Sequence, residues 1–233
     1  MKPKSENIVY TNNRSLKDHE KQMISLISKH PNAINSSFNI LDLGAADGMF
    51  LSSLKEKLPL SNCTGIDYDS ALIHQGQKYS EIKLIQAEIS PSMIRKIDEK
   101  FDAIILSGFL TMFSNPFELL ESITNLLKPK GRVYIFGRFN DSPYDLKIEH
   151  RENTNSDFSD TRYVISLNKY RDFAVKFNLK FSYSNFNLKL NLPKAEKNPH
   201  KTHTVKLYNG RNILVSGRGE FVDVMFVQLE LDK

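Results

Sequence analysis

Short apolar runs alternate with segments of helical spacing between residues 38 and 139. Five of the runs predict strands, over 39–43, 63–67, 82–89, 102–106 and 132–136. Apolar residues spaced three or four apart between these runs predict helices over 49–58, 70–79, 91–99 and 116–127. Strands that alternate with helices are typical of a parallel sheet built from β-α units.

The segments on either side of this region follow other patterns. Before it, we expect a helix with an apolar stripe and with Ser15 and Asp18 as its capping pair. After it, residues 139–161 are rich in Asn, Asp and Ser without any period, which predicts a long loop. The rest of the chain predicts a helix over 167–177, a strand over 179–190, a hairpin over 205–215 and a final strand over 221–229.

Two helices of the repeating region begin with capping signals. Asn115 can cap the helix that follows it, with Pro116 at the first helical position. Asp69 and Ser70 are likewise interpreted as helix caps rather than as ligand contacts.

Composition limits the class of protein. The 233 residues are 40% hydrophobic and 25% charged, as in an ordinary globular domain with at most a small appendage. The sequence has neither a long apolar stretch nor a secretory signal, so we expect no membrane contact and a cytoplasmic location.

A single cysteine, Cys63, excludes a disulfide framework and a cysteine-built zinc site. His200 and His203 have no nearby acidic or cysteine companion, so no metal is expected.

Positive charge is concentrated in one segment. The net charge is +5, but residues 169–218 hold eleven Lys or Arg and only two acidic residues. Such a segment is typical of a solvated face or of a site for an anionic small substrate. No aromatic residue lies between Lys189 and Lys206, whereas proteins that bind single strands stack bases on aromatic side chains. We therefore do not expect a nucleic-acid partner.

The candidate chemistry begins where the first predicted strand ends, in the sequence Ile40-Leu-Asp-Leu-Gly-Ala-Ala-Asp-Gly48. Small residues between a strand and a helix let a ligand approach the backbone at the carboxyl edge of the sheet. A dinucleotide fingerprint would place phosphates at this turn. The carboxylates of Asp42 and Asp47 disfavour phosphates and favour a ligand that carries an amine or another cation.

A further acidic residue ends the next predicted strand, in Gly65-Ile66-Asp67-Tyr68-Asp69. A carboxylate at this place in dinucleotide folds accepts hydrogen bonds from ribose hydroxyls. The ligand expected from the two acidic sites is a nucleoside that carries an amine and no phosphate. S-adenosylmethionine fits that description.

With these motifs the sequence resembles the class I S-adenosylmethionine-dependent methyltransferases over residues 38–139. The order of motifs is that of the family: Leu41 to Gly48, Gly65 to Asp67, Gln86 to Ile89, Phe101 to Ile105 and Leu126 to Arg132. Each motif alone is weak, but five in register make the resemblance specific. It implies an α/β fold, a Rossmann-like three-layer sandwich with a mostly parallel seven-stranded sheet and an antiparallel last strand.

The resemblance also implies a division of the chain and a set of cofactor contacts. Residues 1–37 would form an N-terminal helical arm, 38–139 the S-adenosylmethionine-binding core, and 140–233 the acceptor-side insertions and the completion of the sheet. The implied cofactor-binding residues are Asp42, Gly44, Ala45, Ala46 and Gly48 at the methionine part, Asp67 at the ribose, Tyr68 on the adenine face, Glu88 with the Ile89 amide at the adenine edge, and Ser107 at the amino-acid moiety.

The methyl acceptor is not specified by any motif. The long segment after the core suits a closed pocket for a small molecule or a saccharide intermediate, methylated at oxygen or nitrogen. Three residues beyond the fourth and fifth strands are candidate bases, Asp141, Tyr144 and His150, and we select His150 because an imidazole takes up a proton near neutral pH. Two alternatives stay open: an RNA or protein methyltransferase that uses residues 169–218, or a non-catalytic protein that binds S-adenosylmethionine. The oligomeric state is not predicted.

Overall fold

A computed structural model describes residues 15–34, 38–151, 159–186, 191–194, 201–208, 210, 212–216, 221–222 and 224–232. Its helices are α1 (Asp18–Ile27), α2 (Met49–Lys57), α3 (Ser70–Gly76), α4 (Pro91–Ile94), the 3-10 turn η2 (Leu110–Met112), α5 (Phe117–Thr124) and α6 (Leu167–Lys176). Its strands are β1 (Asn39–Leu43), β2 (Asn62–Asp67), β3 (Lys83–Gln86), β4 (Phe101–Ser107), β5 (Leu127–Arg138), β6 (Leu146–Arg151), β7 (Ser159–Val164), β8 (Leu179–Asn185), β9 (His203–Lys206), β10 (Asn212–Val215), β11 (Phe221–Val222) and β12 (Val224–Leu231).

Seven of the strands form one sheet in the order β3-β2-β1-β4-β5-β12-β8. The pairs from β3 to β5 are parallel, and β12 runs antiparallel to both of its neighbours. This arrangement confirms the expected Rossmann-like sheet with an antiparallel last strand. The strand order changes direction at β1, whose other neighbour is β4, and open α/β sheets bind ligands at the carboxyl ends of strands at such a switch point.

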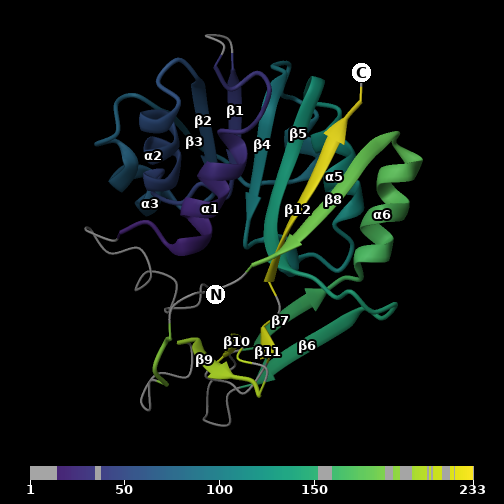
Figure 1. The fold of residues 1–233 in the computed structure, drawn as a ribbon. Coiled ribbons are helices and arrows are strands. Elements are labelled where there is room, and N and C mark those ends of the chain that lie inside the picture. Colours follow the sequence, from purple (N-terminus) through teal and green to yellow (C-terminus); the bar gives the residue numbers. More distant parts are fainter. Residues whose placement is uncertain are drawn as a thin grey trace.

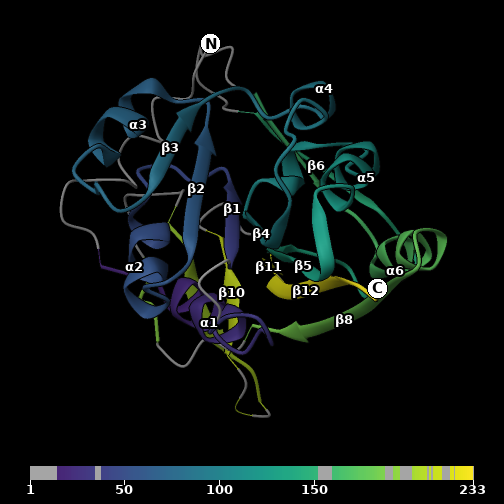
Figure 2. The ribbon, with the colours of Figure 1, turned by 90° about the horizontal axis from the view of Figure 1, so that it is seen from above.

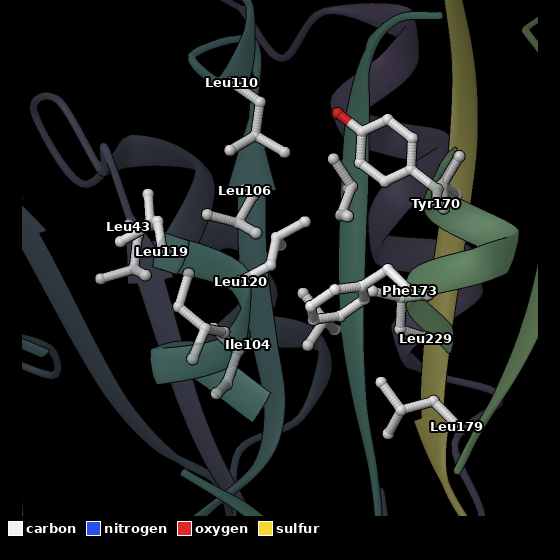
Figure 3. Close-up of a cluster of buried hydrophobic side chains, with 14 of the residues drawn as sticks. Leu43, Ile104, Leu106, Leu110, Leu119, Leu120, Tyr170, Phe173, Leu179 and Leu229 are labelled. Carbon is white, nitrogen blue, oxygen red and sulfur yellow. The ribbon is translucent and has the colours of Figure 1, made fainter. Parts of the chain in front are cut away.

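Helices cover both faces of the sheet, as the view along the strands shows (Figure 2), with α1, α2 and α3 on one face and α4, α5 and α6 on the other. On the second face, side chains of α5 and α6 such as Leu120 and Phe173 pack against Ile104 and Leu106 of β4 (Figure 3). On the first face, α1 and α2 pack against a separate cluster that includes Ile105 of β4. The alternation along β4 therefore explains its nearly continuous apolar sequence, because the strand is buried on both sides.

The carboxyl ends of the parallel strands point toward two smaller sheets, β6-β7 and β9-β10-β11 (Figure 1). The hairpin predicted around residue 209 is confirmed, because β9 and β10 pair antiparallel with His203 opposite Val215. Residues 139–161 were expected to be a loop, and this prediction is wrong. Leu146–Arg151 and Ser159–Val164 pair as an antiparallel ribbon, while 152–158 lie outside the described residues.

Several element boundaries also differ from expectation. The helix of the N-terminal arm begins at Asp18, and the backbone amide of Lys17 donates to Glu20 Oε2 at 2.7 Å, so Ser15 and Asp18 are not its capping pair. Helix α5 begins one residue later than expected, and Asn115 Oδ1 accepts a hydrogen bond from the Phe117 amide. It ends at Thr124, and β5 begins at Leu127, which was expected to be the last helical residue.

Strand β8 ends at Asn185, and the rest of the strand predicted over 179–190 falls partly outside the described residues. Among the helices that the structure describes, none combines the length and the apolar composition needed to cross a membrane.

Candidate functional site

The turn after β1 has an unusual backbone. Gly44, Ala46 and Gly48 all have positive φ angles, of 86°, 51° and 73°. The amides of Gly44 and Ala45 both donate to the Ile66 carbonyl of β2, at 2.8 and 3.1 Å. Alternate left-handed residues turn the chain sharply from β1 into α2, and the two shared hydrogen bonds fix this turn to the end of β2.

Asp67 connects the ends of the first two strands. It is 7% exposed, its Oδ2 accepts from the Ala46 amide at 2.8 Å, and its Oδ1 accepts from the Asp69 amide at 2.9 Å. Each carboxylate oxygen has two lone pairs, so both can accept a further hydrogen bond from a ligand. Asp69 caps α3 by accepting from the Ala71 amide at 2.9 Å, which confirms its interpretation as a cap.

Two glycines outside this turn, Gly65 of β2 and Gly76 of α3, pack closely against it. A Cβ added at Gly65 would lie 2.7 Å from the Ala45 Cβ, and one added at Gly76 would lie 2.6 Å from the backbone oxygen of Asp47. The absence of a side chain at Gly76 therefore allows the end of α3 to contact the turn itself.

We expect Gly76→Ala to lower the free energy of unfolding by about 2 kcal/mol, because the added methyl group meets backbone that cannot move independently. Gly137→Ala in β5 is the matched control, since the nearest atom to its Cβ would lie at 3.7 Å in ordinary contact. Chemical denaturation of both variants checks this. Equal loss of stability in the two would show that the contact with Asp47 is not the cause.

Asp42 lies on β1 beside this turn, on the sheet face that α1 and α2 cover. The side chain is 3% exposed, and it makes no hydrogen bond within the described part of the chain. Burial, together with the carboxylates of Asp67 and Glu20, raises the pKa of Asp42 to about 8. The free protein therefore holds a buried, mostly protonated carboxyl group at neutral pH, where a cationic ligand would favour its ionised form.

The first turn of α1 also reaches this edge of the sheet, which the sequence did not predict. Glu20 is 8% exposed and acts on Asp42, as described above. The neighbouring His19 ring stacks on Phe136 with centroids 4.4 Å apart and planes at 5°. Phe136 is the register neighbour of Ser107 on β4, so the first turn of α1 lies one strand away from Ser107.

The other predicted cofactor residues lie around the same edge. Ser107 ends β4 and is half-buried, while Tyr68, directly after β2, is 48% exposed. Glu88 and Ile89 follow β3, with Glu88 exposed and Ile89 partly buried against the core. The ends of β1 and β2 thus bring together the turn, Asp42 and Asp67. The other predicted cofactor residues follow or end β3, β2 and β4 at the same edge of the sheet.

The candidate bases lie in or before the β6-β7 ribbon. His150 is half-buried in β6, directly opposite Asp160 of β7, and residues opposite each other in such a pair have neighbouring side chains. The ribbon contacts η2 through β7, and η2 follows the loop after Ser107. Asp141 and Tyr144 are both exposed, Tyr144 by 70%. Of the three candidate bases, His150 therefore has an acidic residue, Asp160, opposite it in the ribbon. The loop predicted over residues 139–161 did not indicate this pairing.

The donor set at this edge favours a particular kind of ligand. Buried carboxylates at the ends of β1 and β2 suit cationic and hydroxyl groups, and the tight turn leaves backbone close to a ligand. Within the described ranges, no group of three or more His, Cys, Asp or Glu side chains could hold a metal ion. The carboxylates at the strand ends suit a ligand that carries positive charge and hydroxyl groups.

Comparison with known sequences agrees with this description. Residues 15–175 of the 233 match the protein family described as "Methyltransferase domain". No curated protein sequence matches the chain.

Solved structures with the same fold cover most of the chain. The YcgJ protein from Bacillus subtilis has a TM-score of 0.59 at 13% identity, over 93% of this chain and 100% of that one. The plantazolicin methyltransferase BpumL, in complex with a triazolic desmethylPZN analog and SAH, has a TM-score of 0.56 at 14% identity, over 93% and 87%. Coclaurine N-methyltransferase, bound to N-methylheliamine and SAH, has a TM-score of 0.59 at 14% identity, over 76% and 54%. At these identities the likenesses show the fold.

Proposed function

The chain belongs to the family of methyltransferase domains, and we propose that it transfers a methyl group from S-adenosylmethionine to the oxygen or nitrogen of a small molecule or saccharide intermediate. The observation that carries this proposal is the buried Asp42, which makes no hydrogen bond in the described part of the chain and lies beside a turn fixed by Asp67. The ionised form of a carboxyl group in that position is stabilised most by a ligand that carries both a positive charge and hydrogen-bond donors.

The residues at the strand ends fit S-adenosylmethionine in charge and in position. We propose that Asp67, whose oxygens keep lone pairs beyond those used by the Ala46 and Asp69 amides, accepts the ribose hydroxyls, and that Asp42 lies by the methionine part. The other residues proposed to bind it are Gly44, Ala45, Ala46 and Gly48 in the turn, Tyr68 on the adenine face, Glu88 and Ile89 at the adenine edge, and Ser107 by the amino-acid moiety.

When bound, S-adenosylmethionine supplies a methyl group on a sulfonium that is already a reactive leaving group. The protein then contributes mainly by holding the acceptor atom in line with that methyl group, and positioning alone can supply much of the acceleration. His150 is proposed as the general base that takes the proton from a hydroxyl acceptor. Asp160, which is ion-paired with Arg162 at 2.9 Å, lies opposite it in the ribbon.

The region after residue 139 supports a small acceptor. The β6-β7 ribbon and the β9-β10-β11 sheet lie beyond the carboxyl ends of the parallel strands, on the side of the sheet where the acceptor would bind (Figure 1). Two structural neighbours contain small ligands, a triazolic desmethylPZN analog in one and N-methylheliamine in the other.

The proposal is tested by calorimetry, followed by transfer assays. Titration with S-adenosylmethionine and with S-adenosylhomocysteine should give one saturable site each. Radiolabelled methyl transfer is then measured against hydroxylated and amine-bearing small molecules, with mixed RNA as a comparison. If the protein bound neither S-adenosylmethionine nor S-adenosylhomocysteine, the proposal would be refuted. Transfer to RNA that weakens steeply with salt would instead favour the nucleic-acid alternative.

A further inference from the structure

The main sheet ends in a strand whose outer edge is open. Strand β8 pairs with β12 on one side, and no described strand pairs with its other side. Figure 2 shows β8 at the end of the sheet beyond β12, with α6 over one of its faces. Four successive residues of the strand, 182–185, are exposed. An edge strand of this kind presents a row of backbone donors and acceptors to a further strand.

The hydrogen-bond pattern shows which backbone groups of β8 point outward. The Phe186 amide, directly after β8, donates to the Val224 carbonyl opposite it at 3.0 Å. In an antiparallel pair, directly opposite residues exchange hydrogen bonds at every second position. The even-numbered residues of β8 therefore bond to β12. The amides and carbonyls that point away from β12 belong to the odd-numbered residues, Leu179, Phe181, Tyr183 and Asn185.

Strand β8 lacks the features that keep edge strands from pairing. Such strands are usually short, or carry a proline, a bulge or an exposed charge. The other edge strand of this sheet, β3, has four residues and begins with Lys83. By contrast, β8 has seven residues in unbroken register with β12 and no proline, and its one charged side chain, Lys180, is ion-paired with Asp232. The edge is therefore long, regular and nearly neutral.

Exposed apolar side chains lie beside this edge. Phe181 faces α6, where the guanidinium carbon of Arg171 lies 5.6 Å from the centre of its ring. Tyr183 is on the same face of β8, two residues further along, and is 45% exposed. Val175 follows Arg171 by one helical turn and is 72% exposed. Exposed apolar side chains that gather along one edge are typical of an interaction surface.

We propose that the edge of β8 binds the same edge of a second copy of this chain, antiparallel and about a two-fold axis at Ser182, so that one sheet continues through both copies. In this register Phe181 lies opposite the partner's Tyr183. Both residues have outward amides and carbonyls, so each such pair exchanges two hydrogen bonds. The edge is self-complementary, because the aromatic side chains face each other and Lys180 faces the partner's Ser184 instead of a second charge.

This pairing keeps the two proposed cofactor sites apart. Strand β8 runs in the same direction as β5, since β12 is antiparallel to both. Two copies that pair antiparallel through β8 therefore turn the carboxyl ends of their parallel strands to opposite edges of the joined sheet. Neither copy completes the site of the other. Dimerisation and the binding of S-adenosylmethionine are thus independent, and each proposal can fail without the other.

The first test is sedimentation velocity of the full chain and of Tyr183→Pro. Proline at this position removes an outward amide that β12 does not use, so the sheet is retained while the pairing of two copies loses two hydrogen bonds. We expect the wild-type protein to be mostly dimeric at about 100 μM, and Tyr183→Pro to weaken dimerisation by about tenfold or more. Calorimetry should show unchanged affinity for S-adenosylmethionine in the variant. A wild-type protein that stays monomeric, or a dimer that Tyr183→Pro leaves intact, would overturn the inference.

Cysteine variants test the register and do not depend on the folding of Tyr183→Pro. Ser182 would face the partner's Ser182 in a non-hydrogen-bonded pair with Cα atoms about 4.5 Å apart, within reach of a disulfide. Ser184→Cys is the matched control, because it lies on the same exposed face but its Cα atoms in the two copies would be roughly 14 Å apart. Under mild oxidation, Ser182→Cys should form a covalent dimer and Ser184→Cys should not, while the native Cys63 is buried. Equal cross-linking of the two variants, or none in Ser182→Cys, would contradict the proposed pairing.

Discussion

Asp67→Ala should weaken the binding of S-adenosylmethionine by about 10- to 100-fold, because hydrogen bonds to a charged group contribute about 1.5–3 kcal/mol. The structure adds a second reason. The carboxylate also accepts the Ala46 and Asp69 amides, so its removal frees the turn that would contact the methionine part. Calorimetry at equal fractions of folded protein measures the effect.

The neighbouring Asp69 supplies a matched control for this prediction. Its side chain is equally buried but caps α3 through the Ala71 amide, so Asp69→Ala should cost about 1 kcal/mol of stability and leave affinity nearly unchanged. Asp67→Asn keeps one acceptor oxygen and should fall between the wild type and Asp67→Ala. Equal affinity in folded Asp67→Ala would show that this carboxylate does not hold the ribose.

His150→Ala should lower kcat for a hydroxyl acceptor by about 100-fold or more, because general-base catalysis contributes about 10²–10⁴-fold. The affinity for S-adenosylmethionine should stay within about threefold, since His150 lies in the β6-β7 ribbon and not among the strand ends proposed to bind it. Asp160→Asn should give a smaller loss of kcat, because the imidazole remains but loses its charged neighbour. Single-turnover transfer of a radiolabelled methyl group measures both.

The control for these variants is His74→Ala, an exposed histidine in the last turn of α3. It should change neither kcat nor cofactor affinity. If His150→Ala kept more than about a third of the wild-type turnover, base catalysis would be excluded and positioning alone would account for the rate. The search for acceptor contacts would then move to Asp141 and Tyr144.

The parallel core was predictable because its signals are local. Each strand of the core is a short apolar run, and the run of β4 is continuous because both faces of the strand are covered. The turn after β1 and the acid that ends β2 were also readable, since small residues and carboxylates at strand ends are visible in the sequence itself. Their contact through the Ala46 amide follows from the pairing of adjacent parallel strands.

The ribbon and the first turn of α1 were not predictable, for different reasons. No side chain of β6 is buried, so the strand has no apolar side to give it a period. His150 and Asp160 therefore appeared to be separate loop residues. Glu20 contributes to the raised pKa of Asp42 only because α1 folds back across the sheet, and no spacing along the chain indicates that arrangement.

The position of β12 has a consequence for how the chain folds during synthesis. This strand lies between β5 and β8, although it is made after both of them. While the ribosome is still adding residues 224–231, β8 and α6 have no strand to connect them to the rest of the sheet. The first five strands can pair as they emerge, but β8 can join the sheet only after β12 has paired with β5, and such late, long-range pairing is slow.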